Sequence, residues 1–223
     1  VSLPRLVLLD PMLPEAKALD PAPGWVLLGV GGDDASPAGV DLDRDGPALL
    51  VLGPPRSGRS TALATAARWL LERGRRIVVV AAPGSPLHGW AGAPGVLGRV
   101  TPADATALAT LLAQDPTAAV VVDDAETLQD GPVESLLLAG LSPAVPPRPL
   151  LLAAHAGDAA VAFRGLTVEA RRSRTGVLLG ALSPGESELL GVRRWSGRPG
   201  PPGRGLLVVR GHTSPVQIAA TER

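Results

Sequence analysis

Continuous apolar runs alternate with amphipathic segments through the middle of the chain. A strand covered on both faces has no polar positions, so each such run is typical of a buried strand in a parallel sheet. The expected strands are residues 48–53, 76–82, 118–122 and 149–155, and the expected helices between them are residues 60–74, 101–115 and 131–141. This alternation predicts right-handed crossovers and an α/β fold, with a mostly parallel sheet covered by helices on both faces.

Two of the expected helices carry end signals. Gly74 ends the first helical segment, where a glycine suits the left-handed stop of a helix. The second opens with Thr101 as the expected N-cap, Pro102 at the first helical position and Asp104 three residues after the cap. We therefore expect that helix to begin at Pro102.

The flanking segments are less regular. Residues 1–47 are rich in Pro, Gly and Asp, and their apolar runs LVLL and WVLLGV predict edge strands that lead into the main sheet. The expected loops are residues 83–98 and 193–205, the expected helix is residues 160–174, and the expected C-terminal β-hairpin is residues 205–219. We expect a single domain, in which residues 1–47 are a lead-in to the main body of residues 48–223.

Composition narrows the classes of protein. The 21 basic and 21 acidic residues give a net charge of zero, which disfavours broad, sequence-blind DNA coating. The absence of cysteine excludes disulfides and thiolate zinc sites and fits a reduced, cytoplasmic setting. No apolar run approaches the ~20 residues of a membrane span. Lys17 is the only lysine, and the other basic residues are arginines.

Between the first strand and its helix lies a glycine-rich segment. It matches the phosphate-loop pattern of Gly, four residues, Gly, Lys and Ser or Thr everywhere except at the lysine, which is Arg59. Glycines let successive backbone N–H groups face a phosphate, and the helix adds its positive end. The residues predicted to bind nucleotide here are Gly53, Pro54, Pro55, Arg56, Ser57, Gly58, Arg59, Ser60 and Thr61. A tight strand-to-helix turn without a ligand is the alternative interpretation.

Two side chains of this loop carry specific chemistry. The hydroxyl of Ser60 is expected to bind Mg²⁺. Arg59 keeps the positive charge of the missing lysine, but its side chain is longer, planar and forked. We expect it to reach a phosphate from a different position than a lysine does.

Two adjacent aspartates end the third apolar strand. Asp123 is expected to seat Mg²⁺ opposite Ser60, usually through water. Asp124 is the candidate water-activating carboxylate. Many motors use Glu at this position, which is one methylene longer, and Glu126 is therefore a possible substitute for the shorter Asp124. The alternative interpretation is that these acids cap the following helix.

With both motifs placed, the chain resembles the FtsK/SpoIIIE class of RecA-like P-loop ATPases. The resemblance is closest to actinobacterial members that write the loop as GPPRSGRSTAL and the acidic strand as VVVDDAE. It covers nearly the whole chain, because GVGGDDASPAGVDL resembles the segment before the loop. Similarly, FRGLTVEARRSRTGVLL, ELLGV and PGRGLLV with VQIA resemble the C-terminal portion.

The resemblance implies a RecA-like fold, ATP and Mg²⁺ as cofactors, and a polar sensor facing the γ-phosphate at His155. A histidine that merely ends a strand is the alternative for His155. The family includes DNA translocases and the EccC-type motors of type VII secretion. In those motors some modules are implied to bind nucleotide with little hydrolysis, to regulate neighbours, or to hold a substrate's C-terminal signal in a groove.

The implied partners are other ATPase modules, a hexameric ring and a secreted signal segment, with DNA disfavoured by the neutral charge. The expected location is cytoplasmic, either free or as the soluble part of a membrane-anchored protein. Arg171, Arg172 and Arg174 offer either a finger toward a neighbouring subunit's nucleotide or a solvated helix face, and we favour the latter.

Three hypotheses follow. Arg59 and Asp124 both depart from the active pattern, which favours a degenerate nucleotide-binding module whose hydrolysis is slow or absent. A competent ATPase that drives DNA or protein translocation is the second hypothesis. A structural domain that no longer admits nucleotide is the third.

Overall fold

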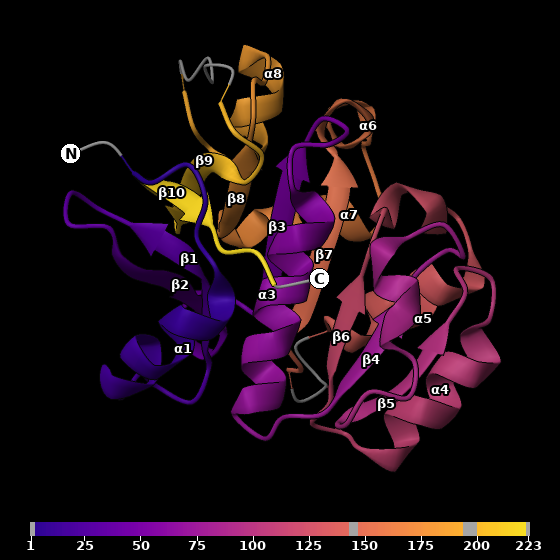
Figure 1. The fold of residues 1–223 in the computed structure, drawn as a ribbon. Helices are drawn as coiled ribbons and strands as arrows, with labels where there is room; N and C mark the ends of the chain where they lie inside the picture. Colours follow the sequence, from indigo (N-terminus) through magenta and orange to yellow (C-terminus); the bar gives the residue numbers. More distant parts are fainter. Residues whose placement is uncertain (1–2, 143–146, 194–199, 222–223) are drawn as a thin grey trace.

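One ten-stranded sheet organises the described part of the chain, residues 3–142, 147–193 and 200–221 of a computed structural model. The spatial order is β2-β1-β10-β9-β8-β3-β7-β6-β4-β5 (Figure 1). The strands are β1 (Trp25–Gly31), β2 (Ser36–Asp41), β3 (Ala48–Gly53), β4 (Ile77–Val80), β5 (Val96–Val100), β6 (Ala119–Val122), β7 (Leu150–His155), β8 (Gly176–Leu179), β9 (Arg204–Val209) and β10 (His212–Ile218). The half from β8 to β5 is parallel. Strands β9, β10, β1 and β2 extend it as an antiparallel wing.

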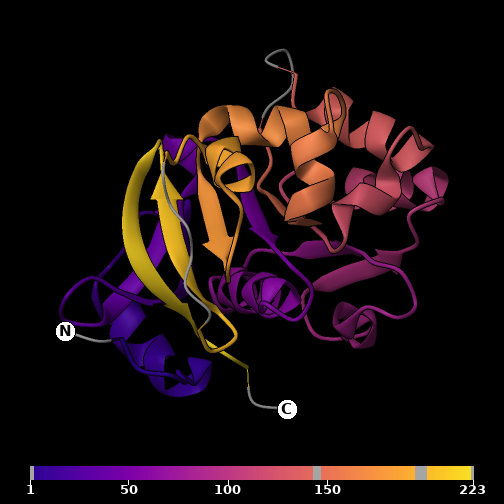
Figure 2. The ribbon, with the colours of Figure 1, turned by 90° about the horizontal axis from the view of Figure 1, so that it is seen from above.

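Helices cover both faces of the sheet, as expected. The α-helices are α1 (Leu9–Ala18), α2 (Leu42–Asp45), α3 (Arg59–Glu72), α4 (Ala105–Gln114), α5 (Pro132–Gly140), α6 (Ala156–Val161), α7 (Leu166–Ala170) and α8 (Pro184–Ser187), and the 3₁₀ helices are η1 (Pro86–Trp90), η2 (Ala125–Leu128), η3 (Arg171–Ser173) and η4 (Glu188–Leu190). Helices α1 and α3 pack into one apolar layer, whereas α4, α5, α6 and α7 pack into the other. The view from above shows α3 on one side of the sheet and α5 to α7 on the other (Figure 2).

Strand β3 shows why the parallel strands are apolar at every position. Leu49 and Val51 point into the layer that contains α3, and Leu50 and Leu52 point into the opposite layer. Successive side chains of a strand face opposite sides, so a strand covered twice needs apolar residues throughout. The predicted buried strands are therefore confirmed.

Strand β7 sets the relative level of its two neighbours. Leu50 of β3 and Val122 of β6 both lie opposite Leu152, and Gly53 lies opposite His155. The three strands are parallel, so their carboxyl ends share one edge of the sheet. The arrowheads of β3 and β7 mark this edge at the top of Figure 1.

The start of α4 differs from the expectation. The helix begins at Ala105, and Asp104 rather than Thr101 is the N-cap, with its Oδ1 accepting a hydrogen bond from Ala107 N (2.9 Å). Thr101 instead closes a turn, because its carbonyl accepts from Asp104 N (3.1 Å). An aspartate caps better than a threonine, and its negative charge also suits the positive end of the helix.

The expected edge strand LVLL is also wrong. Leu8 forms only an isolated bridge with Ala220, and α1 begins at Leu9. The residues that α1 buries follow helical spacing: Leu9, Met12, Leu13 and Ala16. Most of that apolar stripe lies after LVLL. The four residues of the run, taken alone, therefore indicated a strand.

Other boundaries are partly right. The expected loop 83–98 contains η1 and the start of β5, a strand at the edge of the sheet whose side chains are mostly half-buried. The expected helix 160–174 is interrupted before α7, where Gly165 takes a φ of 99°. The C-terminal hairpin is confirmed as β9 and β10. Residues 194–199 of the expected loop 193–205 lie outside the described residues.

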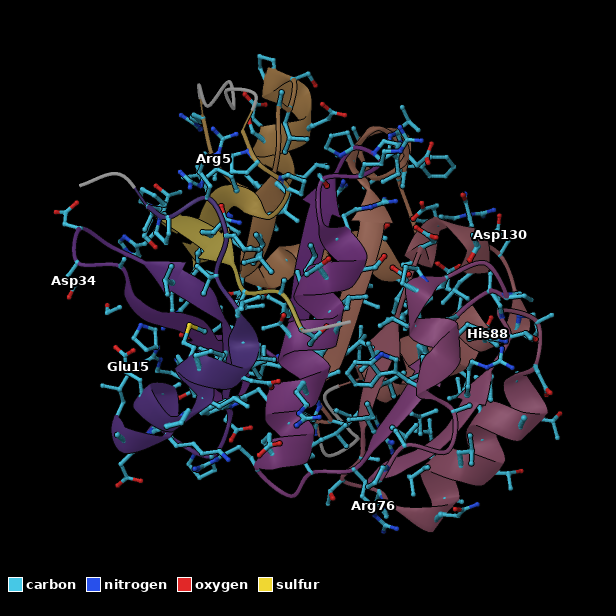
Figure 3. All side chains as sticks on the ribbon, in the orientation of Figure 1. Arg5, Glu15, Asp34, Arg76, His88 and Asp130 are labelled. Carbon is cyan, nitrogen blue, oxygen red and sulfur yellow. The ribbon has the colours of Figure 1, made fainter. Side chains whose placement is uncertain are left out.

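The surface shows no separation of charge by sign among the labelled side chains. Arg5, Glu15, Asp34, Arg76 and Asp130 project from different edges of the ribbon (Figure 3). None of the helices in the described ranges is long and apolar enough to cross a bilayer.

A buried tryptophan joins α3 to the antiparallel wing. Trp69 is fully buried, and its Nε1–H donates a hydrogen bond to the carbonyl oxygen of Trp25 (2.7 Å). The two rings meet edge to face, with centroids 5.2 Å apart and planes at 83°. Edge-to-face pairs stabilise beyond the apolar area that they bury.

We predict that Trp69→Phe lowers the free energy of unfolding by about 2–4 kcal/mol, because it leaves a cavity and an unpaired carbonyl. Urea denaturation followed by far-ultraviolet circular dichroism measures the change. Trp90→Phe, at a partly exposed position of η1, is the matched control. Equal effects of the two substitutions would contradict the assigned role of Trp69.

Candidate functional site

The glycine-rich segment forms the turn from β3 into α3. Arg56 and Gly58 adopt positive φ values of 64° and 102°, and α3 begins at Arg59. Residues with such φ values turn successive backbone N–H groups inward, and the first turn of a helix leaves its N–H groups without helical partners. Pro54 and Pro55 have no N–H, so the donors come from the later half of the loop. We call this segment, residues 53–61, the phosphate loop.

Small residues allow the loop to close tightly on itself. A Cβ atom at Gly53 would collide with the Ser57 hydroxyl, so this end of β3 requires glycine. The Ser57 side chain is buried, and its Oγ has no hydrogen-bond partner among the described residues. A buried hydroxyl without a partner usually indicates a missing ligand or water.

The C-terminal hairpin supports the loop from outside. Gly203 N donates a hydrogen bond to the carbonyl oxygen of Ser57 (2.7 Å), and a Cβ atom at Gly58 would lie 2.8 Å from that same nitrogen. Gln217, which is 2% exposed, donates from Nε2 to the carbonyl oxygen of Pro202 (2.9 Å). Sequence reasoning missed this contact, because nothing in a Pro- and Gly-rich segment indicates which distant loop it meets.

Asp123 lies across from Ser60, directly after β6. Ser60 Oγ lies 3.0 and 3.1 Å from the two carboxylate oxygens of Asp123, which is 2% exposed. The backbone N–H of Asp123 donates to the carbonyl oxygen of Val80 (3.0 Å). Both β3 and β6 pair in parallel with β7, so their carboxyl ends lie at one edge of the sheet. Ser60 and Asp123, which are 63 positions apart, therefore meet at that edge.

Ser85 is a member of this cluster that sequence reasoning missed. It follows β4 and donates a hydrogen bond from Oγ to Asp123 Oδ2 (2.5 Å), while its Oγ accepts from Leu87 N (3.1 Å). A serine before a proline at the start of a short helix was the available signal. The parallel pairing of β4 with β6 brings that serine to the same edge as Asp123.

Arg59 faces the other two acids. Its Nη2 donates to Asp124 Oδ1 (3.0 Å), and its Nη1 lies 3.7 Å from Glu126 Oε1. The Arg59 side chain is 14% exposed, and Nη1 has no hydrogen-bond partner among the described residues. The guanidinium thus sits between the phosphate loop and the two candidate catalytic carboxylates.

Burial and neighbouring charge oppose each other at these acids. Burial raises the pKa of Asp124, the charge of Asp123 raises it further, and Arg59 lowers it. Burial also raises the pKa of Glu126, while hydrogen bonds from backbone N–H groups, including that of His155, lower it. The arginine therefore helps to keep both carboxyl groups ionised.

His155 contacts the acidic cluster through its backbone. Its N–H donates to Glu126 Oε2 (3.2 Å), whereas its ring Nδ1 lies 3.1 Å from Asp158 Oδ2. The His155 ring is thus directed toward α6.

The structure groups five of the predicted site residues: Arg59, Ser60, Asp123, Asp124 and Glu126. Thr61, also predicted to bind nucleotide, is half-buried in the first turn of α3.

The residues fit a metal-bound phosphate group. Hydroxyl and carboxylate oxygens are the ligands that Mg²⁺ prefers, and Ser60 and Asp123 supply one of each. The described ranges contain no group of three or more His, Cys, Asp or Glu residues that could hold a metal on their own. A cation here would need phosphate oxygens or water to complete its coordination.

The arrangement defines a class of fold. A buried strand, a glycine-rich turn into a helix, and an aspartate at the end of a parallel strand two positions away characterise the P-loop ATPase domain. The mostly parallel sheet with helices on both faces matches the fold of solved EccC ATPase domains, and the C-terminal hairpin of β9 and β10 is present.

Solved structures of secretion ATPases share this fold. The chain is similar to EccC of Thermomonospora curvata (ATPases 2 and 3, in complex with a signal sequence peptide), with 21% identity and a TM-score of 0.77 over 100% of this chain and 44% of that one. It is similar to EssC of Geobacillus thermodenitrificans (ATPases 2 and 3), with 19% identity and a TM-score of 0.74 over 99% and 45%. The expected resemblance to this class of ATPase is confirmed at the level of the fold.

A more distant likeness is to the pCW3 conjugation coupling protein TcpA in its monomer form with ATPγS. The identity is 15% and the TM-score 0.61, over 98% of this chain and 71% of that one. No protein-family model matches the chain, and no curated protein matches it in sequence. The chain spans about half the length of the EccC and EssC structures described above.

We predict that Ser85→Ala lowers the free energy of unfolding by about 1–3 kcal/mol, since it removes a hydrogen bond from a buried carboxylate and the cap of η1. Urea denaturation measures the loss. Ser135→Ala is the control, because the Ser135 hydroxyl is exposed and donates to the Gly131 carbonyl of its own helix (3.2 Å). That variant should stay within about 0.5 kcal/mol of the parent. A Ser85→Ala protein as stable as the control would contradict a bond of this kind.

Proposed function

We propose that this chain is a nucleotide-binding module of a translocation motor of the type VII secretion kind. It binds ATP with Mg²⁺ and hydrolyses it slowly or not at all. The observation that carries the proposal is the contact of Ser60 with buried Asp123 directly beside the phosphate loop. The fold likeness to EccC and EssC ATPase domains supports it.

The chain's own residues assign the parts of the nucleotide site. Backbone N–H groups of the phosphate loop would hold the phosphates, and Ser60 and Asp123 would seat Mg²⁺. The buried Ser57 Oγ and Arg59 Nη1, which lack partners among the described residues, are polar groups that phosphate oxygens or water would satisfy. When bound, Mg²⁺ neutralises charge on the β- and γ-phosphates.

Slow hydrolysis is supported by the positions of the two candidate bases. Asp124 holds a φ of 51° and is hydrogen-bonded to Arg59. Glu126 accepts a hydrogen bond from His155 N. A general base must bring a free lone pair within reach of the proton that it abstracts. Asp124 is also one methylene shorter than the Glu that many such motors use, and Glu126 stays bonded to His155, so nucleotide binding should outlast turnover.

We further propose that the module acts through its neighbours in a longer motor. Other ATPase modules, arranged in a ring, and the signal segment of a secreted protein are the proposed partners, with the module on the cytoplasmic side. The signal peptide bound in the EccC structure supports this choice. The net charge of zero makes DNA a weaker candidate.

Titration with a fluorescent ATP analogue, with and without Mg²⁺, tests the binding. We expect saturable binding that Mg²⁺ strengthens, and Ser60→Ala should weaken the Mg²⁺-dependent part about tenfold, as loss of groups at a metal site commonly does. Ser135→Ala should bind like the parent. Absence of binding by the parent would favour a structural domain instead.

Steady-state phosphate release tests the turnover. We expect a rate near background for the parent, and Arg59→Lys should tighten nucleotide binding several-fold by restoring a compact charge that suits phosphate. That single change should leave phosphate release slow, because Asp124 remains one methylene shorter than the Glu of active motors and Glu126 remains bonded to His155 N. A large gain in rate from Arg59→Lys would sink the proposal of a degenerate site.

A further inference from the structure

The guanidinium of Arg59 is engaged by the acidic segment after β6. Its Nη2 donates to Asp124 Oδ1 at 3.0 Å, and the side chains of Arg59 and Asp124 are 14% and 40% exposed. By contrast, the pair of Arg164 with Asp130 is formed by side chains that are 64% and 59% exposed. Exposed pairs contribute little because water screens them, whereas a sheltered pair is screened much less. The Arg59 pair is therefore the one expected to constrain the phosphate loop.

Further hydrogen bonds fix the backbone of Asp124 and the carboxylate of Glu126. The carbonyl oxygen of Asp124 accepts hydrogen bonds from both the N–H (2.9 Å) and the hydroxyl (2.7 Å) of Thr127. Glu126 is fixed on its other side by the backbone N–H of His155 (3.2 Å). An arginine side chain rotates about several bonds, so Arg59 is the component that can move.

The arrangement is also incompletely satisfied. Nη1 of Arg59 is buried, lies 3.7 Å from Glu126 Oε1, and makes no hydrogen bond within the described residues. Phosphate offers a guanidinium several strongly accepting oxygens in a geometry that suits its fork. A phosphate group in the loop would therefore compete with Asp124 for the same side chain.

We propose that Arg59 is a latch: without nucleotide it ties the phosphate loop to Asp124 and Glu126, and a bound phosphate group releases it. This inference rests on the proposed nucleotide binding and adds a mode of regulation to that site. Release frees Asp124 and Glu126 from the arginine. Since Glu126 also contacts His155, the state of the loop is communicated to the end of β7.

The test is a double-mutant cycle on the full chain, with Arg59→Gln, Asp124→Asn and the double variant. Binding of the fluorescent ATP analogue with Mg²⁺ is the first readout. We expect Asp124→Asn to tighten the dissociation constant about tenfold, or about 1.4 kcal/mol. In the Arg59→Gln background the same change should alter it less than about twofold, because non-additivity reports a direct interaction.

Simple charge repulsion between Asp124 and phosphate predicts a different pattern. Removing the carboxylate would then tighten binding equally in both backgrounds, and that result overturns the latch while leaving nucleotide binding intact. Asp130→Asn, which removes the acid of the exposed pair, is the control and should leave the dissociation constant unchanged.

Unfolding of the nucleotide-free variants in urea is the second readout, and it tests the pair without any ligand. The latch requires the losses of stability in Arg59→Gln and Asp124→Asn to be non-additive in the double variant. Strict additivity overturns the latch whether or not nucleotide binds. Non-additive stability together with no binding by any variant overturns the proposed nucleotide binding and, with it, release by phosphate.

Discussion

The register in which β7 pairs with β3 and β6 is the constraint on which the rest of the site depends. Leu152 faces both Leu50 and Val122, so the ends of the two flanking strands lie at one edge of the sheet. A slip by one residue in either pairing would turn alternate side chains toward the wrong layer. The apolar layers on both faces therefore hold the register, and the register holds Asp123 beside Ser60.

Exchanging lysine for arginine in a phosphate loop changes more than the shape of one cation. A planar fork can serve two acceptors at once, and here one of its nitrogens already bonds Asp124. The same side chain that would approach a phosphate thus also neutralises the candidate bases. The two departures from an active ATPase pattern, Arg59 and Asp124, contact each other directly and form a single structural unit.

Much of the fold and the centre of the site could be predicted from local pattern. Uninterrupted apolar runs identify the buried strands. The phosphate loop and the paired aspartates follow the carboxyl ends of such strands, where open parallel sheets bind ligands. What could not be predicted depended on distant contacts or on competition between neighbours. Asp104 replaced Thr101 as a cap, β5 is a half-buried edge strand, and Ser85 and Gly203 reach the site only through tertiary packing.

Hydrogen bonds also connect the N-terminal segment to the phosphate loop, through the side chain of Arg204 and the backbone of Gly203. Arg204 donates hydrogen bonds from Nη2 to the carbonyl oxygens of Leu3 (2.9 Å) and Pro4 (2.7 Å), and its neighbour Gly203 bonds Ser57 (2.7 Å). A displacement of residues 3 and 4 is thus separated from the phosphate loop by two residues and two hydrogen bonds. Tension on the polypeptide at residues 3 and 4 would therefore reach the phosphate loop through Arg204 and Gly203 without passing through the apolar core.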